Sequence, residues 1–309
     1  MIVSPCYNEE AILAYSAERL TSLLQQLVQR AKIAPESYIL YVNDGSRDRT
    51  WELIEELHQR YAEVSGLCLA GNVGHQFAIM AGMLEVVEEA DAVITIDADL
   101  QDDLGAIETM IDRYREGYDI VYGVKKTREA DPWLKRTTAL PFSRLQSAMG
   151  IRAVYNHADF RLMSRQALEM LAGYKERNLY LRGLIPLIGL RSATVDDHIS
   201  EREAGRSKYT LRKMLNLALD GITSFSVKPI YYVIYLGFLF LLISLGIGVY
   251  VIHAFISHTE VAGWASLILS IWLVGAMLMI SIGTVGLYIA KIYGEVKHRP
   301  LYNISQILD

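Results

Sequence analysis

Three carboxylates lie close together in the sequence Asp97-Ala98-Asp99-Leu100-Gln101-Asp102. The preceding residues, 92–96, are apolar and mostly β-branched, which is typical of a buried strand. Carboxylates at the carboxyl end of such a strand occupy the edge where open α/β sheets bind ligands, and carboxylate and amide oxygens suit Mg²⁺ or Mn²⁺. An acidic N-cap for the following helix is the alternative. The pattern alone leaves both interpretations open.

Polar residues also follow three other expected strands, and we call a polar segment directly after a strand a polar exit. Residues 5–10 follow a strand over 1–4, residues 43–48 follow one over 38–42, and residues 71–75 follow one over 66–70. Ordinary turn chemistry explains each exit separately. Four polar exits at one edge of a sheet nevertheless predict a shared ligand crevice.

The elements that position these exits alternate regularly. Helical apolar spacing indicates helices over 11–31, 50–62, 76–88 and about 104–116, and a further strand is expected over 119–123. Repeated strand–helix units build a mostly parallel, doubly wound sheet. The fold class expected is therefore α/β.

The apolar residues concentrate towards the C-terminus. The chain has 309 residues, of which 52% are hydrophobic, and its mean hydropathy is +0.20. Residues 230–256 and 263–290 contain no Asp, Glu, Lys or Arg. Each stretch is longer than the roughly 20 residues that a helix needs to cross a bilayer. We therefore expect two transmembrane helices.

Basic residues lie on one side of the two expected spans. They are absent from the connecting loop 257–262, so the positive-inside rule predicts that both termini are cytoplasmic. A net charge of −5 argues against a nucleic-acid partner. The flanking basic residues are Arg206, Lys208, Arg212, Lys213 and Lys228 before the first span, and Lys291, Lys297 and Arg299 after the second.

Three motifs, in order and spacing, resemble glycosyltransferase family 2, and two further motifs resemble one branch of it. The chain is similar to its polyprenyl-phosphate branch, which includes GtrB-type undecaprenyl-phosphate glucosyltransferases and dolichyl-phosphate mannose synthases. The resemblance implies a GT-A type nucleotide-sugar fold. The motifs are Pro5-x-Tyr7-Asn8-Glu9, Asn43-Asp44-Gly45-Ser46, Asp97-Ala98-Asp99-Leu100-Gln101-Asp102, Ala158-Asp159-Phe160-Arg161-Leu162-Met163 and Arg202-x-x-Gly205-x-Ser207-Lys208-Tyr209.

The resemblance also implies roles for the motif residues in binding the donor. A Mg²⁺ or Mn²⁺ ion and the donor diphosphate would lie against Asp97, Asp99 and Gln101. The catalytic group would be Asp97, Asp99, Asp159 and Arg161. The nucleotide sugar would contact Pro5, Tyr7, Glu9 and Asp44, together with Asp97, Ala98 and Asp99.

The acceptor of the resembled branch is a lipid phosphate, which basic residues would bind. The resemblance implies Arg136, Arg161, Arg202 and Lys208 for this role. Alternatives are a surface position for Arg136 and a structural Asp159–Arg161 pair. Asp159 is expected either to act as a base or to orient Arg161. We interpret His75, which also fits the family pattern, as structural.

Four segments are expected along the chain. A catalytic domain over 1–208 precedes a juxtamembrane amphipathic helix over 209–228, a two-helix transmembrane domain over 229–290 and a cytoplasmic tail over 291–309. Packing of residues 209–227 against the catalytic domain is the alternative. The polar tail is a candidate contact with a second copy, so a homo-oligomer remains open.

The resemblance implies an inverting hexose transfer at the cytoplasmic face of a bacterial inner membrane. UDP-glucose is the first choice of donor, and undecaprenyl or another polyprenyl phosphate is the acceptor. A phosphate monoester is already an anion at neutral pH, because its second pKa is about 6. No strong general base is therefore needed. Alternatives are GDP-mannose or a modified UDP-sugar, a processive polysaccharide synthase, and a non-catalytic membrane scaffold.

Overall fold

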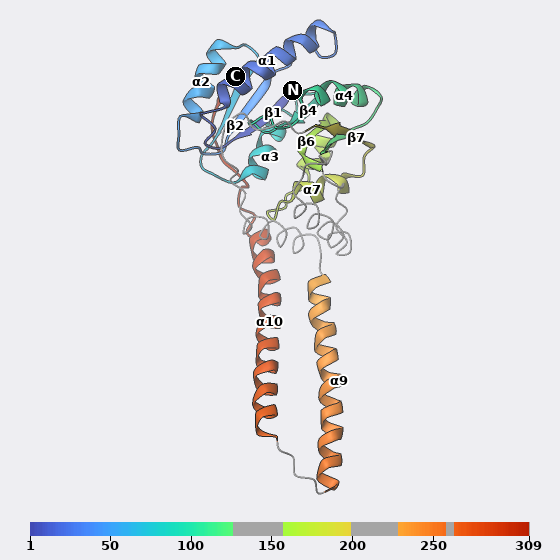
Figure 1. Cartoon of the computed structure of the whole chain (residues 1–309). Coiled ribbons are helices and arrows are strands. Elements are labelled where there is room, and N and C mark those ends of the chain that lie inside the picture. The colour runs from blue at the N-terminus through green and yellow to red at the C-terminus, as the bar shows by residue number, and fades with distance from the viewer. Residues whose placement is uncertain (126–156, 199–227, 258–262, 309) are drawn as a thin grey trace. The chain divides into compact units, whose positions relative to one another are not determined.

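The structure, a computed structural model, describes residues 1–125, 157–198, 228–257 and 263–308 (Figure 1). It divides into two compact units. One, here the α/β domain, comprises residues 1–216 and 299–309, and the other, here the helical hairpin, comprises residues 217–298. The juxtamembrane helix expected over 209–228 lies outside the described residues, except for its last residue, Lys228, which begins the first long helix.

The α/β domain is built on an eight-stranded sheet with the order β7-β5-β6-β4-β1-β2-β3-β8. Strands β4, β1, β2 and β3 are parallel. Strand β6 runs antiparallel between β4 and β5, and β5 pairs in parallel with β7. The mostly parallel α/β sheet expected from the sequence is confirmed. The strands are β1 Ile2–Cys6, β2 Ile39–Asn43, β3 Val64–Leu69, β4 Ala92–Thr95, β5 Ile120–Lys125, β6 His157–Ser164, β7 Ser192–Asp197 and β8 Ile304–Leu308.

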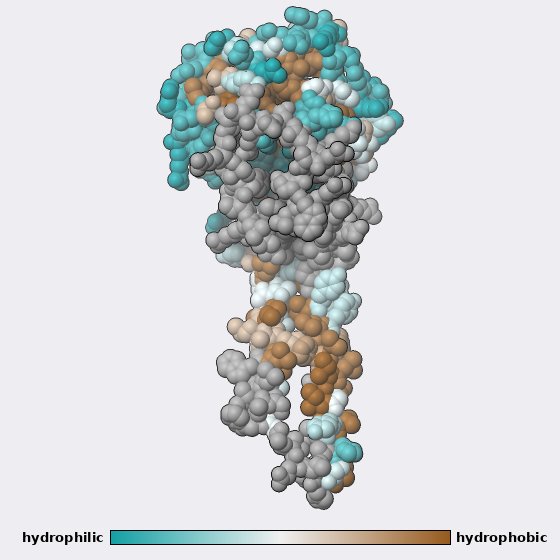
Figure 2. Space-filling model, viewed as in Figure 1, coloured by the Kyte–Doolittle hydropathy of each residue, from teal (hydrophilic) through white to brown (hydrophobic). Residues whose placement is uncertain are grey.

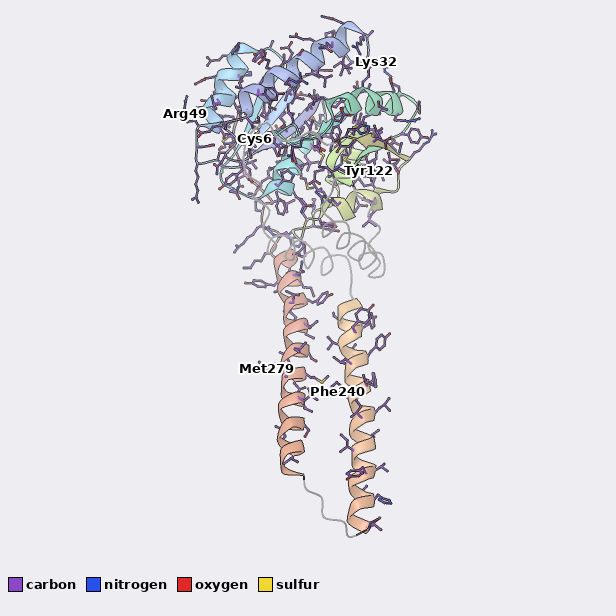
Figure 3. All side chains as sticks on the ribbon, viewed as in Figure 1. Cys6, Lys32, Arg49, Tyr122, Phe240 and Met279 are labelled. Carbon is purple, nitrogen blue, oxygen red and sulfur yellow. The ribbon has the colours of Figure 1, made fainter. Side chains whose placement is uncertain are left out.

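Helices cover both faces of this sheet. Helices α1 (Leu13–Gln29), α2 (Thr50–Arg60) and α4 (Leu104–Arg115) share one hydrophobic cluster with inward-facing strand residues. Lys32, which follows α1 and is labelled in Figure 3, joins this layer to α4 through a 2.5 Å contact with Asp112. Burying each large aliphatic side chain of this layer contributes about 1.5–3 kcal/mol.

Helix α3 (His75–Glu85) packs on the opposite face. Gly82 permits this close approach, because a Cβ there would lie 2.5 Å from the Val3 side chain and 2.6 Å from that of Val42. Helix α6 (Arg165–Ala172) contacts α3. The short helices α7 (Leu181–Leu184) and η1 (Ile185–Ile188) follow α6 in the chain.

The C-terminal strand β8 closes one edge of the sheet. It pairs antiparallel with β3, and Ser65 donates a hydrogen bond to the Leu308 carbonyl while Ser305 donates one of 3.0 Å to the Cys68 carbonyl. The sequence predicted a separate tail over 291–309. Instead, residues 291–296 continue the second long helix and residues 304–308 belong to the α/β domain. The pairing needs no second copy of the chain, so a homo-oligomer stays a prediction.

The helical hairpin consists of α9 (Lys228–Ile256) and α10 (Trp264–Val296). Both helices are long and apolar enough to cross a membrane, with mean hydropathies of 2.3 over Ile230–Ile247 and 2.0 over Leu273–Val296. Their described side chains are largely exposed, and Figure 2 shows the hydrophobic surface along them. A soluble protein would bury such a surface, so the hairpin fits a lipid environment.

Removing residues 304–309 is expected to lower the free energy of unfolding by about 2 kcal/mol, because β3 loses its edge partner and Leu308 loses its contact with Gly66. For a domain of this size the loss corresponds to about 4–8 °C in unfolding temperature. Thermal unfolding of the purified protein in detergent measures it. Gln306→Ser, which keeps the strand, serves as the control, and an unchanged unfolding temperature of the truncated protein would contradict the assignment of β8.

Candidate active site

The carboxyl ends of the parallel strands lie at one edge of the sheet, as the four polar exits predicted. Strand β6 begins at this edge because it runs antiparallel, and β5 and β7 end there. Turns from distant parts of the chain therefore come together beside β4. The described side chains that the edge contributes are Tyr7, Glu9, Asp44, Asn72, His75, Asp97, Asp99, Gln101, Asp102, Lys125, Asp159 and Asp197.

Asp44, at the exit of β2, holds the loop that follows β3. Its carboxylate accepts hydrogen bonds from the backbone N–H groups of Val73 (2.7 Å) and Gly74 (3.0 Å) and from the side-chain amide of Asn72 (2.9 Å). Asp44 is 2% exposed. Desolvation raises the pKa of its carboxyl group, although the backbone hydrogen bonds act to lower it. Gly45 has φ +60°, and a Cβ there would lie 2.5 Å from the Asn72 nitrogen. The Asn43-Asp44-Gly45-Ser46 motif thus holds the loop after β3 against the turn after β2.

The predicted nucleotide-binding residues of β1 have different exposures. Pro5 is buried within the strand, whereas Tyr7 presents an aromatic ring that is 37% exposed beside the exit. Glu9 is half-buried, and its backbone N–H donates a 3.0 Å hydrogen bond to Thr50. Ala98 is buried at 3% exposure. Tyr7 is thus the residue of this group with a face that a base could stack on.

The carboxylates after β4 form a tight turn over residues 97–103. The Leu100 backbone N–H donates to the Asp97 carbonyl (3.1 Å), and the Gln101 N–H donates to the Asp99 carboxylate (3.3 Å). The N-cap of α4 is Asp103, whose carboxylate accepts a 2.8 Å hydrogen bond from Gly105. Helix α4 therefore has the acidic N-cap that the alternative interpretation expected, but the capping residue is Asp103, and Asp97 and Asp99 take no part in capping.

Asp97 and Asp99 suit a divalent cation that is shared with a substrate. Partial desolvation and the like charges of Asp159 and Asp99 raise the pKa of Asp97, although its side chain is 48% exposed. Among the described residues, no three His, Cys, Asp or Glu side chains are grouped to hold a metal by themselves. Mg²⁺ is usually held by one or two carboxylates plus substrate phosphates. The two carboxylates therefore fit an ion completed by a diphosphate.

Asp159, at the start of β6, lies within a network of three cationic or titratable side chains. Arg161 Nη2 contacts its Oδ1 at 2.5 Å, and Arg182 Nη2 contacts its Oδ2 at 3.1 Å. His75 Nε2 lies 3.4 Å from Asp159 Oδ2 and 3.5 Å from Asp97 Oδ1. His75 thus links the Asp159 network to the carboxylate turn.

The charges of this network fix its protonation. Desolvation alone would raise the pKa of Asp159. The pKa is nevertheless well below its usual range, because the carboxylate is stabilised by Arg182, His75 and Arg161. Likewise, the hydrogen bond to Asp159 and the charge of Asp97 outweigh desolvation and raise the pKa of His75. Asp159 is consequently an anion at neutral pH and a weak proton acceptor.

Arg161 is fully buried at 0% exposure, as expected for the structural Asp159–Arg161 pair. Its contact with the acceptor phosphate remains a prediction that this burial does not favour. Arg182, on α7, keeps 33% of its side-chain surface exposed beside the same carboxylate. Arg182 is not among the residues predicted from the sequence, and no spacing signal marks it, since α7 has only four residues. His75, which was expected to be structural, contacts two candidate site residues.

Three predicted acceptor residues lie outside the described part of the chain. These are Arg136, Arg202 and Lys208, so their roles stay predictions.

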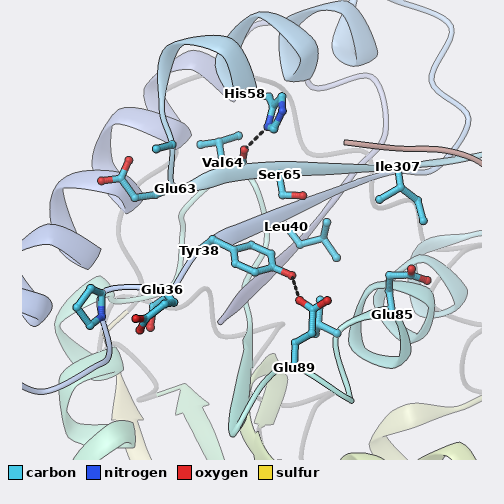
Figure 4. Close-up of a pocket in the computed structure, with 14 residues that line it drawn as sticks. Glu36, Tyr38, Leu40, His58, Glu63, Val64, Ser65, Glu85, Glu89 and Ile307 are labelled. Atoms are coloured by element: carbon cyan, nitrogen blue, oxygen red, sulfur yellow. Dashed lines mark hydrogen bonds between the residues drawn. The ribbon is translucent and has the colours of Figure 1, made fainter. Parts of the chain in front are cut away.

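A separate cavity of about 600 Å³ lies at the other end of the strands, beside the amino ends of β2 and β3 (Figure 4). It is lined by residues at the amino ends of β2 and β3, where Tyr38 donates a 3.1 Å hydrogen bond to Glu89 and His58 contacts the Val64 carbonyl at 2.7 Å. None of the candidate site residues lines it. The cavity is therefore distinct from the carboxylate edge.

Comparison with known proteins agrees with these motifs. The profile of Glycosyl transferase family 2 matches residues 1–171. The chain belongs to this family. A relative from Bacillus subtilis (strain 168), named uncharacterized glycosyltransferase YkoT, is 50% identical over 98% of this chain and 90% of its own length. The protein is a glycosyltransferase, and its mostly parallel sheet is of the GT-A type expected for the family.

Other relatives carry more specific names. The bactoprenol glucosyl transferase of Shigella phage SfV is 36% identical over 98% of this chain and 97% of its own length. The prophage bactoprenol glucosyl transferase homolog of Escherichia coli (strain K12) is 34% identical over 99% of this chain and 98% of its own length. Both matches extend through the region of α9 and α10.

Proposed function

We propose that this glycosyltransferase moves a hexose from a nucleotide sugar to the phosphate of a polyprenyl lipid. The observation that carries the proposal is the match, over 98% of the chain, to a relative named bactoprenol glucosyl transferase. Glucose is accordingly the first choice of sugar, and UDP-glucose the first choice of donor. The two apolar helices give such an enzyme a direct route to a lipid substrate.

The donor is proposed to lie along the exits of β1, β2 and β4. Tyr7 offers a ring for the base, and Asp97 and Asp99, with Gln101, would hold Mg²⁺ or Mn²⁺ against the diphosphate. When bound, the ion would neutralise the charge that builds on the departing nucleoside diphosphate. The half-exposed position of Asp97 and the absence of a capping role for either aspartate support this assignment.

The acceptor is proposed to approach the Asp159 network. Its phosphate is already an anion at neutral pH, and the depressed pKa of Asp159 makes this carboxylate a poor base. The chain therefore needs cations that bring two anionic substrates together. Arg182, which the sequence analysis did not include, joins Arg136, Arg202 and Lys208 as a candidate for this task.

The chemical step is proposed to be a single displacement with inversion. The bond between the sugar C1 and the donor phosphate oxygen breaks as the acceptor phosphate oxygen forms a new bond to C1. The electron pair of the broken bond leaves with the nucleoside diphosphate. No carboxylate nucleophile is required, in contrast to retaining glycosidases. Asp159 is proposed to fix the orientation of Arg182 and Arg161 rather than to remove a proton.

The membrane arrangement is proposed to be two spans in a bacterial inner membrane, with both termini cytoplasmic. Two observations support it. Basic residues flank both spans but are absent from the connecting loop. Strand β8, after the second span, pairs with β3, before the first, so both must lie on one side of a bilayer.

Asp44→Ala is expected to raise the KM for UDP-glucose about tenfold and to leave the KM for the lipid unchanged. The loop 72–74 loses three hydrogen bonds to a buried carboxylate, and about 1.4 kcal/mol of weaker donor binding corresponds to tenfold. Steady-state kinetics with each substrate varied measures both constants. Glu52→Ala, on the exposed side of α2, is the matched control. Equal increases in both KM values would contradict a donor-specific role.

A donor panel tests the proposal as a whole. The purified full-length protein is incubated with undecaprenyl phosphate, Mn²⁺ or Mg²⁺, and one radiolabelled sugar donor at a time: UDP-glucose, other UDP-sugars or GDP-mannose. Label in the extracted lipid from UDP-glucose alone is the expected result. Label from GDP-mannose instead would correct the donor. Label in a growing polymer, or none in lipid from any donor, would overturn the proposal.

A further inference from the structure

The carboxylate turn 97–103 contains a strained residue. Leu100 has φ +48°, in the left-handed region that side chains with a Cβ rarely adopt. Its side chain is 9% exposed and packs in the hydrophobic cluster. A strained backbone persists only where the surrounding structure over-determines it. The turn must therefore be held by contacts besides its own two internal hydrogen bonds.

Two residues from distant strands hold the end of this turn. Asp197, the last residue of β7, is 0% exposed, and its Oδ1 accepts a 2.8 Å hydrogen bond from the Asp103 backbone N–H. Lys125, the last residue of β5, places Nζ 3.3 Å from Oδ1 of Asp102. The backbone of Asp103 and the side chain of Asp102 are thus both fixed from outside the turn.

Stability alone does not explain this arrangement. Asp102 is 4% exposed and Asp197 is 0% exposed, so two carboxylates are buried at the end of this turn. Oδ2 of Asp197 has no hydrogen-bond partner among the residues that the structure describes. Burying like charges with an unsatisfied oxygen is costly.

We propose that Asp197 and Lys125 are positioning residues that hold the strained turn so that Asp97 and Asp99 are presented together to the metal and diphosphate. This inference rests on the proposed function for the identity of the ligand. The clamp itself rests on the hydrogen bond to Asp103, the contact with Asp102 and the conformation of Leu100. Both residues are assigned a role through the turn, and not through contact with the substrate.

The hydrogen bond from the Asp103 N–H to Asp197 predicts that Asp197→Ala and Asp197→Asn affect the turn differently. Asp197→Ala removes the acceptor for the Asp103 N–H and should release the turn. Asp197→Asn keeps an acceptor oxygen, and its amide can donate towards the carboxylate of Asp102, so it should preserve the turn. Asp196→Asn is the matched control, because Asp196 neighbours Asp197 in β7 but is exposed.

Hydrogen–deuterium exchange on the ligand-free, full-length protein tests the clamp directly. Peptides that cover residues 96–104 should exchange at least tenfold faster in Asp197→Ala, while peptides from β1 and β2 keep the wild-type rate. Asp197→Asn and Asp196→Asn should match the wild type. The proposal would be overturned if these peptides exchanged at the same rate in the wild type and in Asp197→Ala. It would also be overturned if they exchanged as fast in Asp197→Asn as in Asp197→Ala. Lys125→Met, expected to loosen the same peptides, provides the test if Asp197→Ala does not fold.

Calorimetric binding of UDP with and without Mn²⁺ separates this inference from the proposed function. Asp197→Ala should weaken the Mn²⁺-dependent part of UDP binding about tenfold and leave metal-free binding unchanged. If the wild type shows no Mn²⁺-dependent UDP binding, the UDP–Mn²⁺ assignment fails while the exchange result still judges the clamp. If the wild type binds and Asp197→Ala binds equally well, the positioning role fails alone.

Discussion

Asp99→Ala is expected to reduce glycosyl transfer at least about a thousandfold while the protein remains folded and bound to the membrane. In the proposed site, Asp99 supplies one of only two carboxylates to the divalent ion. Charge stabilisation by such an ion is worth several kcal/mol, and each 1.36 kcal/mol is a factor of ten in rate. Asp99 is half-buried and does not cap α4, so its removal should cost little stability.

The rate of lipid labelling in single-turnover conditions measures this effect, with thermal unfolding as the test of folding. Asp112→Asn is the matched control, because Asp112 lies on the outer surface of α4, where it pairs with Lys32. A rate above about one tenth of the wild-type rate for Asp99→Ala would remove Asp99 from the metal site.

The second large effect is expected for Asp159→Ala, which should lower both the free energy of unfolding and the rate. Arg161 is fully buried, and Asp159 is its ion-pair partner. Removing one member of a buried pair typically costs about 3–5 kcal/mol, because the other charge stays buried without compensation. Transfer should also be lost, since Arg182 and His75 lose their shared partner.

A double variant distinguishes the two consequences. Asp159→Leu combined with Arg161→Met replaces the pair by apolar side chains and should recover most of the lost stability. It should not recover transfer, because Arg182 still lacks its carboxylate. Chemical denaturation and the lipid-labelling rate measure the two quantities. Unchanged stability of Asp159→Ala would contradict the structural role of the buried Asp159–Arg161 pair.

The sequence predicted the first half of the α/β domain closely. The expected strands and helices up to residue 123 agree with β1–β5 and α1–α4 to within three residues at each end. Local signals were sufficient there, because a parallel strand buried on both faces is a continuous apolar run and a covering helix has an apolar stripe. The convergence of the four polar exits followed from parallel pairing alone.

The later strands depend on partners that are distant in sequence. Strand β6 was noticed only as the motif around Asp159 and Arg161, since charged residues rarely indicate a buried strand. It is buried because those two side chains pair with each other between β4 and β5. Strand β8 has only five residues, four of which are exposed. Its pairing with β3, across more than 230 residues, leaves no local pattern.

The site shows the same division between local and long-range information. The motif aspartates could be identified from their position after β4. The partners that set their chemistry come from α3, α7, β5 and β7, and no spacing in the sequence connects them. Consequently the question of whether Asp159 is a base could only be addressed with Arg182, Arg161 and His75 in place around it.

The proposed displacement breaks the bond between the sugar C1 and the donor phosphate oxygen, and a doubly labelled donor tests this most directly. UDP-glucose carrying ¹⁴C in the sugar and ³²P in the β-phosphate is incubated with the full-length protein, Mn²⁺ and undecaprenyl phosphate, and the lipid is extracted. Attack at C1 predicts ¹⁴C in the lipid and ³²P left in the aqueous phase as UDP. Both labels in the lipid would show transfer of the sugar phosphate, and no ¹⁴C in the lipid would show no transfer of this sugar. Either result would contradict this account.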